Sequence, residues 1–107
     1  MYQLKKTPEE LRNQIDDIVV TNLQLKDTFD KIITIFSELE YQIQSGLSLR
    51  ESITDPKKIE LIDSKISKLR AKKIEIQENI DSLTLVMNKG KQMLKAAQAM
   101  LSELNNI

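Results

Sequence analysis

Apolar residues recur along most of this chain in alternating steps of four and three residues, the spacing of a helix that packs along one side in a coiled coil. The pattern in the first half has no skip, and only Asn22 and Gly46 in it are not apolar. A second pattern fills the other half, with Lys73 and Gly90 as its exceptions. Two long helices packed against each other are therefore predicted. The positions of the two patterns, which we call the seam, are Leu11, Ile15, Ile18, Asn22, Leu25, Phe29, Ile32, Phe36, Leu39, Ile43 and Gly46, then Ile59, Ile62, Ile66, Leu69, Lys73, Ile76, Ile80, Leu83, Met87, Gly90, Leu94, Ala97, Leu101 and Leu104.

Local signals mark where the predicted helices begin and end. Thr7 can cap the first helix, Pro8 suits its first position, and Glu10 completes a capping box. Gly46 is typical of a helix end, and Asp55-Pro56 is a second helix start because proline disfavours helical geometry at the residue before it. The resulting prediction is a tail over 1–7, a helix over 8–46, a connection over 47–55 and a helix over 56–105.

The connection sets how the two helices pair. Ser48 and Glu51 are spaced as another capping box, so a short helical turn is expected there, and the chain would reverse near it. This places Phe36 beside Ile66. The end of the second helix would then extend past the start of the first, where only the N-terminal tail or another molecule could cover its apolar residues. The tail residues available for this are Tyr2 and Leu4, and the residues left over are Met100, Leu101, Leu104 and Ile107.

Gly90 is the position at which the second helix is easiest to interrupt. The heptad phase continues across it, and a glycine inside a helix costs only about 1 kcal/mol. One helix over 56–105 is therefore predicted, with a bend at Gly90 left open. A break there would give a three-helix bundle instead.

More positions are apolar than a hairpin of two helices needs. An apolar surface this wide is typical of a helix with more than one neighbour, although single exposed apolar residues are common. We expect a bundle completed by another chain, either a second copy or an amphipathic helix of a different protein. The partner-binding surface is predicted at the open end of the hairpin, where the apolar residues of the first helix would approach those of the second. Its residues are Val19, Val20, Leu23, Val86, Met93, Met100, Leu101 and Leu104.

Two polar residues interrupt the seam in its interior. A single Asn or Lys at such a position can set register or oligomeric state at some cost in stability, so leucine at either position is expected to raise the melting temperature. By the pairing above, Asn22 faces Ile80, which offers its amide no partner, so a second Asn22 or water would have to supply one. The alternative is that Asn22 lies near solvent and that Lys73 extends its ammonium group to water.

Composition excludes most chemistry. The chain has 107 residues, 16 basic and 16 acidic, and neither Cys nor His, so thiol and imidazole catalysis, disulfides and the usual zinc sites are excluded. Its carboxylates lie off the seam, and no glycine-rich phosphate loop is present. We expect no enzyme activity, no metal and no cofactor. The apolar runs are far shorter than the roughly 18 residues of a membrane span, and a cytoplasmic location is expected, with export alongside a partner left open.

A basic run in the second helix raises the question of nucleic-acid binding. Two residues within the run, Ile66 and Leu69, are seam positions, so this segment is predicted to pack rather than to lie in a groove of DNA. Residues 1–46 carry five basic and eight acidic residues, and residues 47–107 carry eleven and eight, which favours attraction between the helices. No nucleic-acid partner is predicted. The run comprises Lys65, Lys68, Arg70, Lys72 and Lys73.

In outline the chain resembles the small helical-hairpin proteins of the WXG type, which pass with partners through type VII secretion. The likeness depends on overall shape and on Gln44-Ser45-Gly46 in the place of the Trp-x-Gly turn, and no functional residue carries over. The sequence thus predicts a non-enzymatic interaction module that binds a helical segment of a larger protein, as an adaptor, targeting factor or chaperone of, for example, a secretion system. The alternative is a self-assembling structural coiled coil without an external client.

Overall fold

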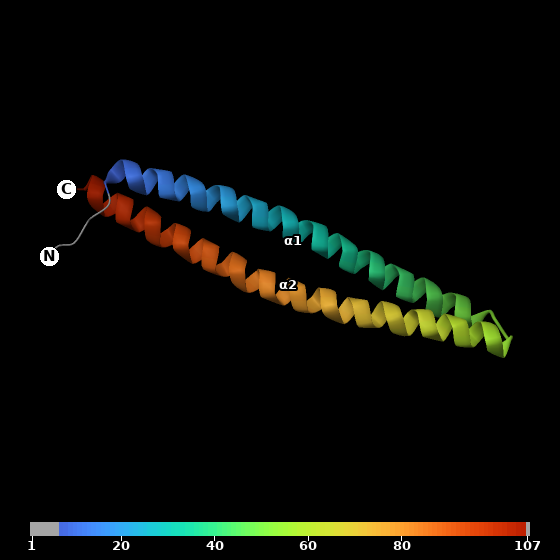
Figure 1. Cartoon of the computed structure of the whole chain (residues 1–107). Helices are drawn as coiled ribbons and strands as arrows, with labels where there is room; N and C mark the ends of the chain where they lie inside the picture. Colours follow the sequence, from blue (N-terminus) through green and yellow to red (C-terminus); the bar gives the residue numbers. More distant parts are fainter. Residues whose placement is uncertain (1–6, 107) are drawn as a thin grey trace. The chain divides into compact units, whose positions relative to one another are not determined.

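The computed structural model of the chain describes residues 7–106, and within them it contains two long helices and no strand. Helix α1 runs over Pro8–Glu51 and helix α2 over Pro56–Asn105 (Figure 1). They pack against each other in opposite directions, which confirms the predicted all-α hairpin. Helix α2 continues through Gly90 without a break, so the three-helix alternative is wrong. The predicted contribution of Tyr2, Leu4 and Ile107 lies outside the described residues.

Both helix starts use the residues that the sequence indicated. The backbone N–H of Glu10 donates to Oγ1 of Thr7 at 3.2 Å, which satisfies one of the amides that the first turn leaves without a helical partner. The backbone N–H of Lys57 donates to Oδ1 of Asp55 at 3.0 Å at the start of α2. Each start is therefore fixed by local chemistry, with a proline at the first helical position.

The end of α1 is where the structure departs from the expectation. Gly46 does not end the helix, because no glycine in the described part has a positive φ and α1 continues to Glu51. A Cβ built at Gly46 would lie 3.1 Å from Cγ1 of Ile66, so this glycine allows the two helices to approach closely instead of forming a turn. The predicted end at residue 46 and the capping box at Ser48 are both wrong. The connection is residues 52–55, and the hydroxyl of Ser52 donates to the Leu49 carbonyl at 2.8 Å beside it.

The later end of α1 changes which residues face each other. Ile66 lies beside Gly46 and not beside Phe36. Asn22 lies beside Gly90 and not beside Ile80, since its Nδ2 donates to the Gly90 carbonyl at 3.2 Å. Counting outward from the pair Asn22 and Gly90 puts the described end of α2 level with the start of α1. The predicted overhang of Met100, Leu101 and Leu104 is therefore wrong.

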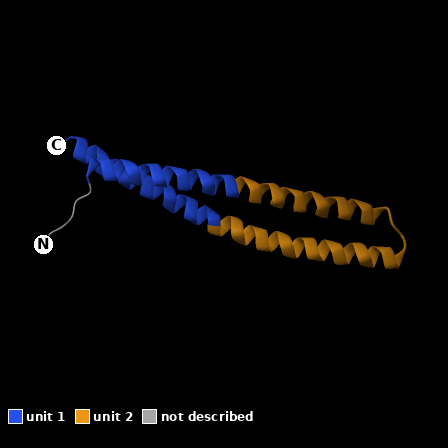
Figure 2. Cartoon of the chain, turned by 45° about the horizontal axis from the view of Figure 1, so that its top comes forward, with its two compact units in different colours: residues 1–28, 83–107 blue, residues 29–82 orange. Residues whose placement is uncertain are grey.

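The chain divides into two compact units, each of which is a pair of antiparallel helical segments (Figure 2). Unit 1 consists of residues 1–28 and 83–107, and unit 2 of residues 29–82. Every seam position in both units is buried or half-buried, as the spacing predicts. Most are only half-buried, because a single neighbouring helix covers one side of a seam. The buried residues of the described part are Leu11, Ile18 and Ala97 in unit 1 and Leu39, Ile43, Ile66 and Ile80 in unit 2.

Candidate protein-interaction site

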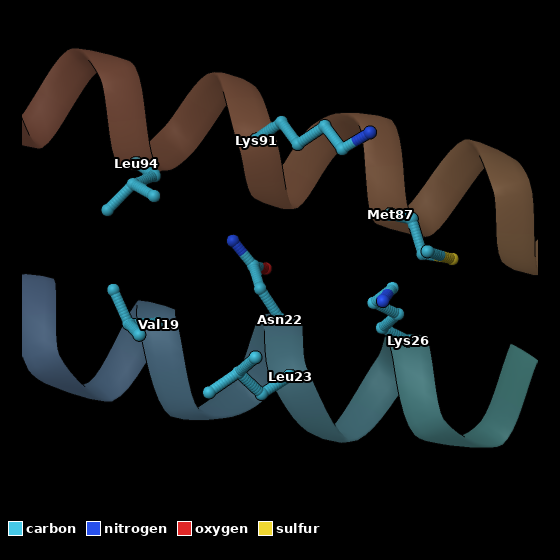
Figure 3. A pocket seen from close by; sticks show the side chains of 7 residues that line it. All are labelled: Val19, Asn22, Leu23, Lys26, Met87, Lys91 and Leu94. Carbon is cyan, nitrogen blue, oxygen red and sulfur yellow. The ribbon is translucent and has the colours of Figure 1, made fainter.

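A polar layer crosses the seam of unit 1. Asn22 is half-buried, and its amide donates to the backbone carbonyl of Gly90 on α2. Any Cβ at Gly90 would collide with Oδ1 of Asn22, so the amide occupies the space that a side chain would take. Figure 3 shows Asn22 rising from α1 toward α2. The two exceptions in the predicted seam are thus partners, and the Gly90 carbonyl gives the Asn22 amide a hydrogen-bond partner that is neither a second Asn22 nor water.

This layer has a consequence for the surface beside it. At the level of Asn22 the seam contains one short side chain and one glycine, so it has less side-chain volume than a layer of two large apolar residues. A hollow of about 370 Å³ opens here on one flank of the seam. We call it the Leu23 hollow (Figure 3), and its lining residues are Val19, Asn22, Leu23, Lys26, Met87, Lys91 and Leu94.

The Leu23 hollow combines an apolar floor with charge of one sign. Figure 3 shows Val19 and Leu94 pointing toward each other across the gap, while Lys26 lies beside Met87. Lys26 comes from α1 and Lys91 from α2, and neither has an ion pair with another residue that the structure describes. The hollow therefore presents two lysine ammonium groups, one from each helix, beside an apolar surface.

A second hollow of about 390 Å³ lies on the other flank of the seam in unit 1. Its charged residues have both signs, with Asp17 on α1 and Lys89 on α2. We call it the Met93 hollow, and it shares only Asn22 with the Leu23 hollow. The lining residues are Gln14, Asp17, Ile18, Thr21, Asn22, Leu25, Val86, Lys89, Gly90 and Met93.

The structure thus divides the predicted partner-binding surface between two flanks. Val19 and Leu23 line one hollow, and Val86 and Met93 line the other, so the expected approach of these two sets does not occur. The reason is that the first set lies at heptad positions e and b of α1 and the second at position g of α2, and positions e and g flank a seam on opposite sides.

The predicted residues also differ in how far they are available to a partner. Leu101 and Leu104 are half-buried in the seam, and Val20 is exposed but lines neither hollow. The sequence reasoning missed Lys26 and Lys91, although their e positions on the two helices could have placed them on one flank. The exposed fractions of the remaining residues are 37% for Val19, 63% for Leu23, 48% for Val86, 55% for Met93 and 51% for Met100.

Unit 2 handles its polar seam residue differently. Lys73 forms an ion pair with Glu40 on α1, and its Nζ lies 5.2 Å from the centre of the Phe36 ring. The hydrogen bond from Lys73, aided by its charge, holds the pKa of the Glu40 carboxyl below its ordinary value. The Lys73 ammonium group is therefore held against α1. That replacing Lys73 by leucine raises the melting temperature stays a prediction, because the ion pair that the change removes is partly exposed to solvent.

A second charge pair joins the helices near the connection. Nε of Arg50 donates to Oδ1 of Asp63 at 2.6 Å and Nη2 donates to Oδ2 at 3.3 Å, so the pair is bidentate. The Asp63 hydrogen bond and charge raise the pKa of the Arg50 guanidinium further above its ordinary value. These side chains are about half exposed, so the pair contributes modestly to stability and mainly fixes the tip of the hairpin.

The hollows of unit 2 are more polar than the Leu23 hollow. One contains two apolar residues, Phe36 and Ile74, beside three polar or charged ones, and the other contains Leu69 alone among polar and basic side chains. Apolar residues are the majority only around the Leu23 hollow. This lining, together with charge of a single sign, makes the Leu23 hollow the candidate site for an apolar partner.

Comparison with protein-family models, with curated proteins and with solved structures finds no match to this chain. Neither helix, over the residues that the structure describes, is long and apolar enough to cross a membrane. The same residues contain no cluster of three or more side chains suited to hold a metal ion.

Proposed function

We propose that this protein is an interaction module that binds an amphipathic helix of another protein in the Leu23 hollow. The observation that carries the proposal is a hollow with apolar residues between two helices, with a lysine on each helix that has no ion pair among the described residues. Such a module would act as an adaptor, targeting factor or chaperone for the protein that contains the bound helix. No group in the hollow would need to react.

The shape of the hollow suits a helix. Val19 and Leu23 are one turn apart on α1, and Met87 and Leu94 are two turns apart on α2. A third helix lying along these residues would offer apolar side chains at matching intervals of three, four and seven. It would also cover the outer side of seam positions that the hairpin leaves half-exposed. Binding would thus bury apolar surface worth about 25 cal/mol per Å² before the cost of association.

The positive charge of the hollow indicates what charge a bound partner helix should carry. Lys26 and Lys91 are both positive, and neither has an acidic partner among the described residues. A partner with Asp or Glu beside its apolar face would pair with both lysines, and one with Lys or Arg there would be repelled. Such contacts at the rim add more to specificity and association rate than to affinity. The partner segment is therefore an acidic amphipathic helix.

Fluorescence anisotropy with synthetic peptides tests the proposal. One labelled peptide of about 18 residues, five helical turns, has leucine along one face and glutamate beside it. A second peptide keeps the leucines and carries lysine for glutamate. The protein should bind the glutamate peptide roughly tenfold more tightly, since two exposed charge pairs together contribute about 1.4 kcal/mol. Equal affinity for the two peptides, or no binding of either, would refute an acidic partner helix.

A matched pair of variants locates the binding site. Leu23→Gln should weaken binding of the glutamate peptide by about tenfold, because it removes an apolar contact of roughly 1.5 kcal/mol. Leu85→Gln is the control, since Leu85 is as exposed, 64% against 63%, and lies outside the Leu23 hollow. Equal losses in the two variants would show that the peptide binds elsewhere. Glutamine keeps helix propensity close to that of leucine, so both variants should remain folded.

A further inference from the structure

A second apolar stripe runs along α2 in unit 1, on the flank away from the Leu23 hollow. It contains Val86, Met93 and Met100, which are 48%, 55% and 51% exposed, and the small exposed residue Ala96. With Lys89 the positions follow one another in alternating steps of three and four, like the main seam. The stripe therefore has the spacing of a second coiled-coil seam, and neither of the two described helices covers it.

Charge marks the two ends of this stripe with opposite signs. Lys89 lies near its start, and Glu103 continues the spacing three residues after Met100. Neither has an ion pair with any residue in the described part of the chain. A helix with the same apolar stripe, but with its acidic end beside Lys89 and its basic end beside Glu103, would complement the stripe along its length. A second copy of the stripe in the antiparallel direction has its charges in these places.

We propose that this stripe, which we call the methionine stripe, binds the methionine stripe of a second copy of the chain, with the two α2 helices antiparallel about a two-fold axis. Centring the axis between Met93 and Ala96 places Met93 of each copy beside Ala96 of the other. The large Met93 side chain thus packs on the small Ala96 side chain at two places in the dimer, and the flexible methionine side chain can adapt to its neighbour. The same register brings Lys89 within one helical turn of Glu103 of the second copy, also twice. A parallel pairing would instead place Lys89 beside Lys89 and Glu103 beside Glu103.

The self-association surface is independent of the proposed partner site. The methionine stripe uses positions g and c of α2, and the Leu23 hollow lies on the opposite flank of the seam. Of the residues in the stripe, none lines the Leu23 hollow. A dimer formed through the stripe could therefore bind an acidic helix in each copy, and either proposal can fail without the other.

Sedimentation velocity of the full chain tests the dimer. At micromolar concentration the sedimentation of the wild type should give a molecular mass twice the 12.3 kDa of one chain. Met93→Gln combined with Met100→Gln should give a monomer with unchanged helicity by circular dichroism. Leu61→Gln combined with Ile74→Gln removes two residues of similar exposure from α2 in unit 2, and this control should remain a dimer. A monomeric wild type, or a dimer that survives the double methionine change, would overturn the proposal.

Charge exchange tests the antiparallel orientation. Lys89→Glu alone or Glu103→Lys alone should raise the dimer dissociation constant about tenfold, because each change creates two pairs of like charges across the interface. The double variant with both changes restores two opposite pairs and should dimerise like the wild type. If the double variant is instead weaker than either single variant, the antiparallel pairing is wrong.

Discussion

The two units each contain a polar residue inside the seam, and they satisfy it in opposite ways. In unit 2, Lys73 is long enough to leave the centre of the seam and form an ion pair with Glu40 on the flank. In unit 1, Asn22 is short, so it needs a backbone carbonyl close by, and only a glycine opposite provides the room. The first solution adds charged groups to the flank. The second removes side-chain volume from the seam.

This difference explains why the candidate binding site lies in unit 1. The hollow beside Lys73 contains charged and polar groups that a partner would have to desolvate. The Leu23 hollow has a mainly apolar floor, and its lysines have no partner within the described residues. A polar residue that lowers the packing density of a seam can thus create a surface for another molecule.

The core of unit 2 should show the largest effect. Ile66 is 4% exposed and packs against Gly46, so Ile66→Ala should lower the free energy of unfolding by about 2–4 kcal/mol through lost burial and an unfilled cavity. Ile74→Ala, at a position 63% exposed on the same helix, should change it by less than about 0.5 kcal/mol. Urea unfolding followed by circular dichroism measures both. A similar loss of unfolding free energy in the two variants would mean that the seam is not the core.

The polar layer of unit 1 should show coupling between its two residues. Gly90→Ala gains about 1 kcal/mol of helix propensity, but the new Cβ forces Oδ1 of Asn22 to move and so disturbs the hydrogen bond that Nδ2 of Asn22 donates to the Gly90 carbonyl. With Asn22→Ala in the background the clash is absent, so the same change should be more favourable by about 1–2 kcal/mol. Urea unfolding of the four proteins in this cycle gives the coupling. If the two changes in unfolding free energy are instead additive, Asn22 and Gly90 are not in contact.

The charge pair of unit 2 should show a smaller, pH-dependent effect. The pKa of Glu40 is lowered in the folded chain, so its contribution to stability is complete above the unfolded value and is lost as pH falls through the folded value. The melting temperature should therefore fall below about pH 4.5, and Glu40→Gln should reduce that fall. Glu38→Gln is the matched control on the same helix. If Glu40→Gln and Glu38→Gln give the same acid profile, the Lys73 pair contributes nothing to acid stability.

The elements of this fold were predictable because their signals are local. The heptad spacing identified every seam position, and Thr7 and Asp55 marked both helix starts correctly. The pairing of the helices was not predictable from Gly46, because a glycine is as compatible with close helix packing as with a helix end. Which role it has depends on Ile66, a residue distant in the sequence. The end of the first helix was predicted at residue 46, five residues before its observed end at residue 51. The residues predicted to face each other across the two helices were therefore wrong.

The candidate site was predictable only in part. The surplus of apolar residues predicted an apolar surface outside the seam, and Val19, Leu23 and Met93 are indeed exposed, while the binding of a partner there stays a prediction. The two separate flanks could have been found from heptad positions, but the hollow could not, because it depends on Asn22 facing Gly90. The likeness to the WXG proteins also loses its one local feature, since Gly46 lies within α1 and forms no turn.

The most direct test of helix binding in the Leu23 hollow reverses its charge. Lys26→Glu with Lys91→Glu changes only two exposed side chains, so the helices should remain intact by circular dichroism. Anisotropy of the two peptides then measures which one this variant prefers. We predict that the preference inverts, with the lysine peptide bound more tightly than the glutamate peptide. A variant that still prefers the glutamate peptide would contradict the site, because the lysines of the hollow would then have no part in recognition.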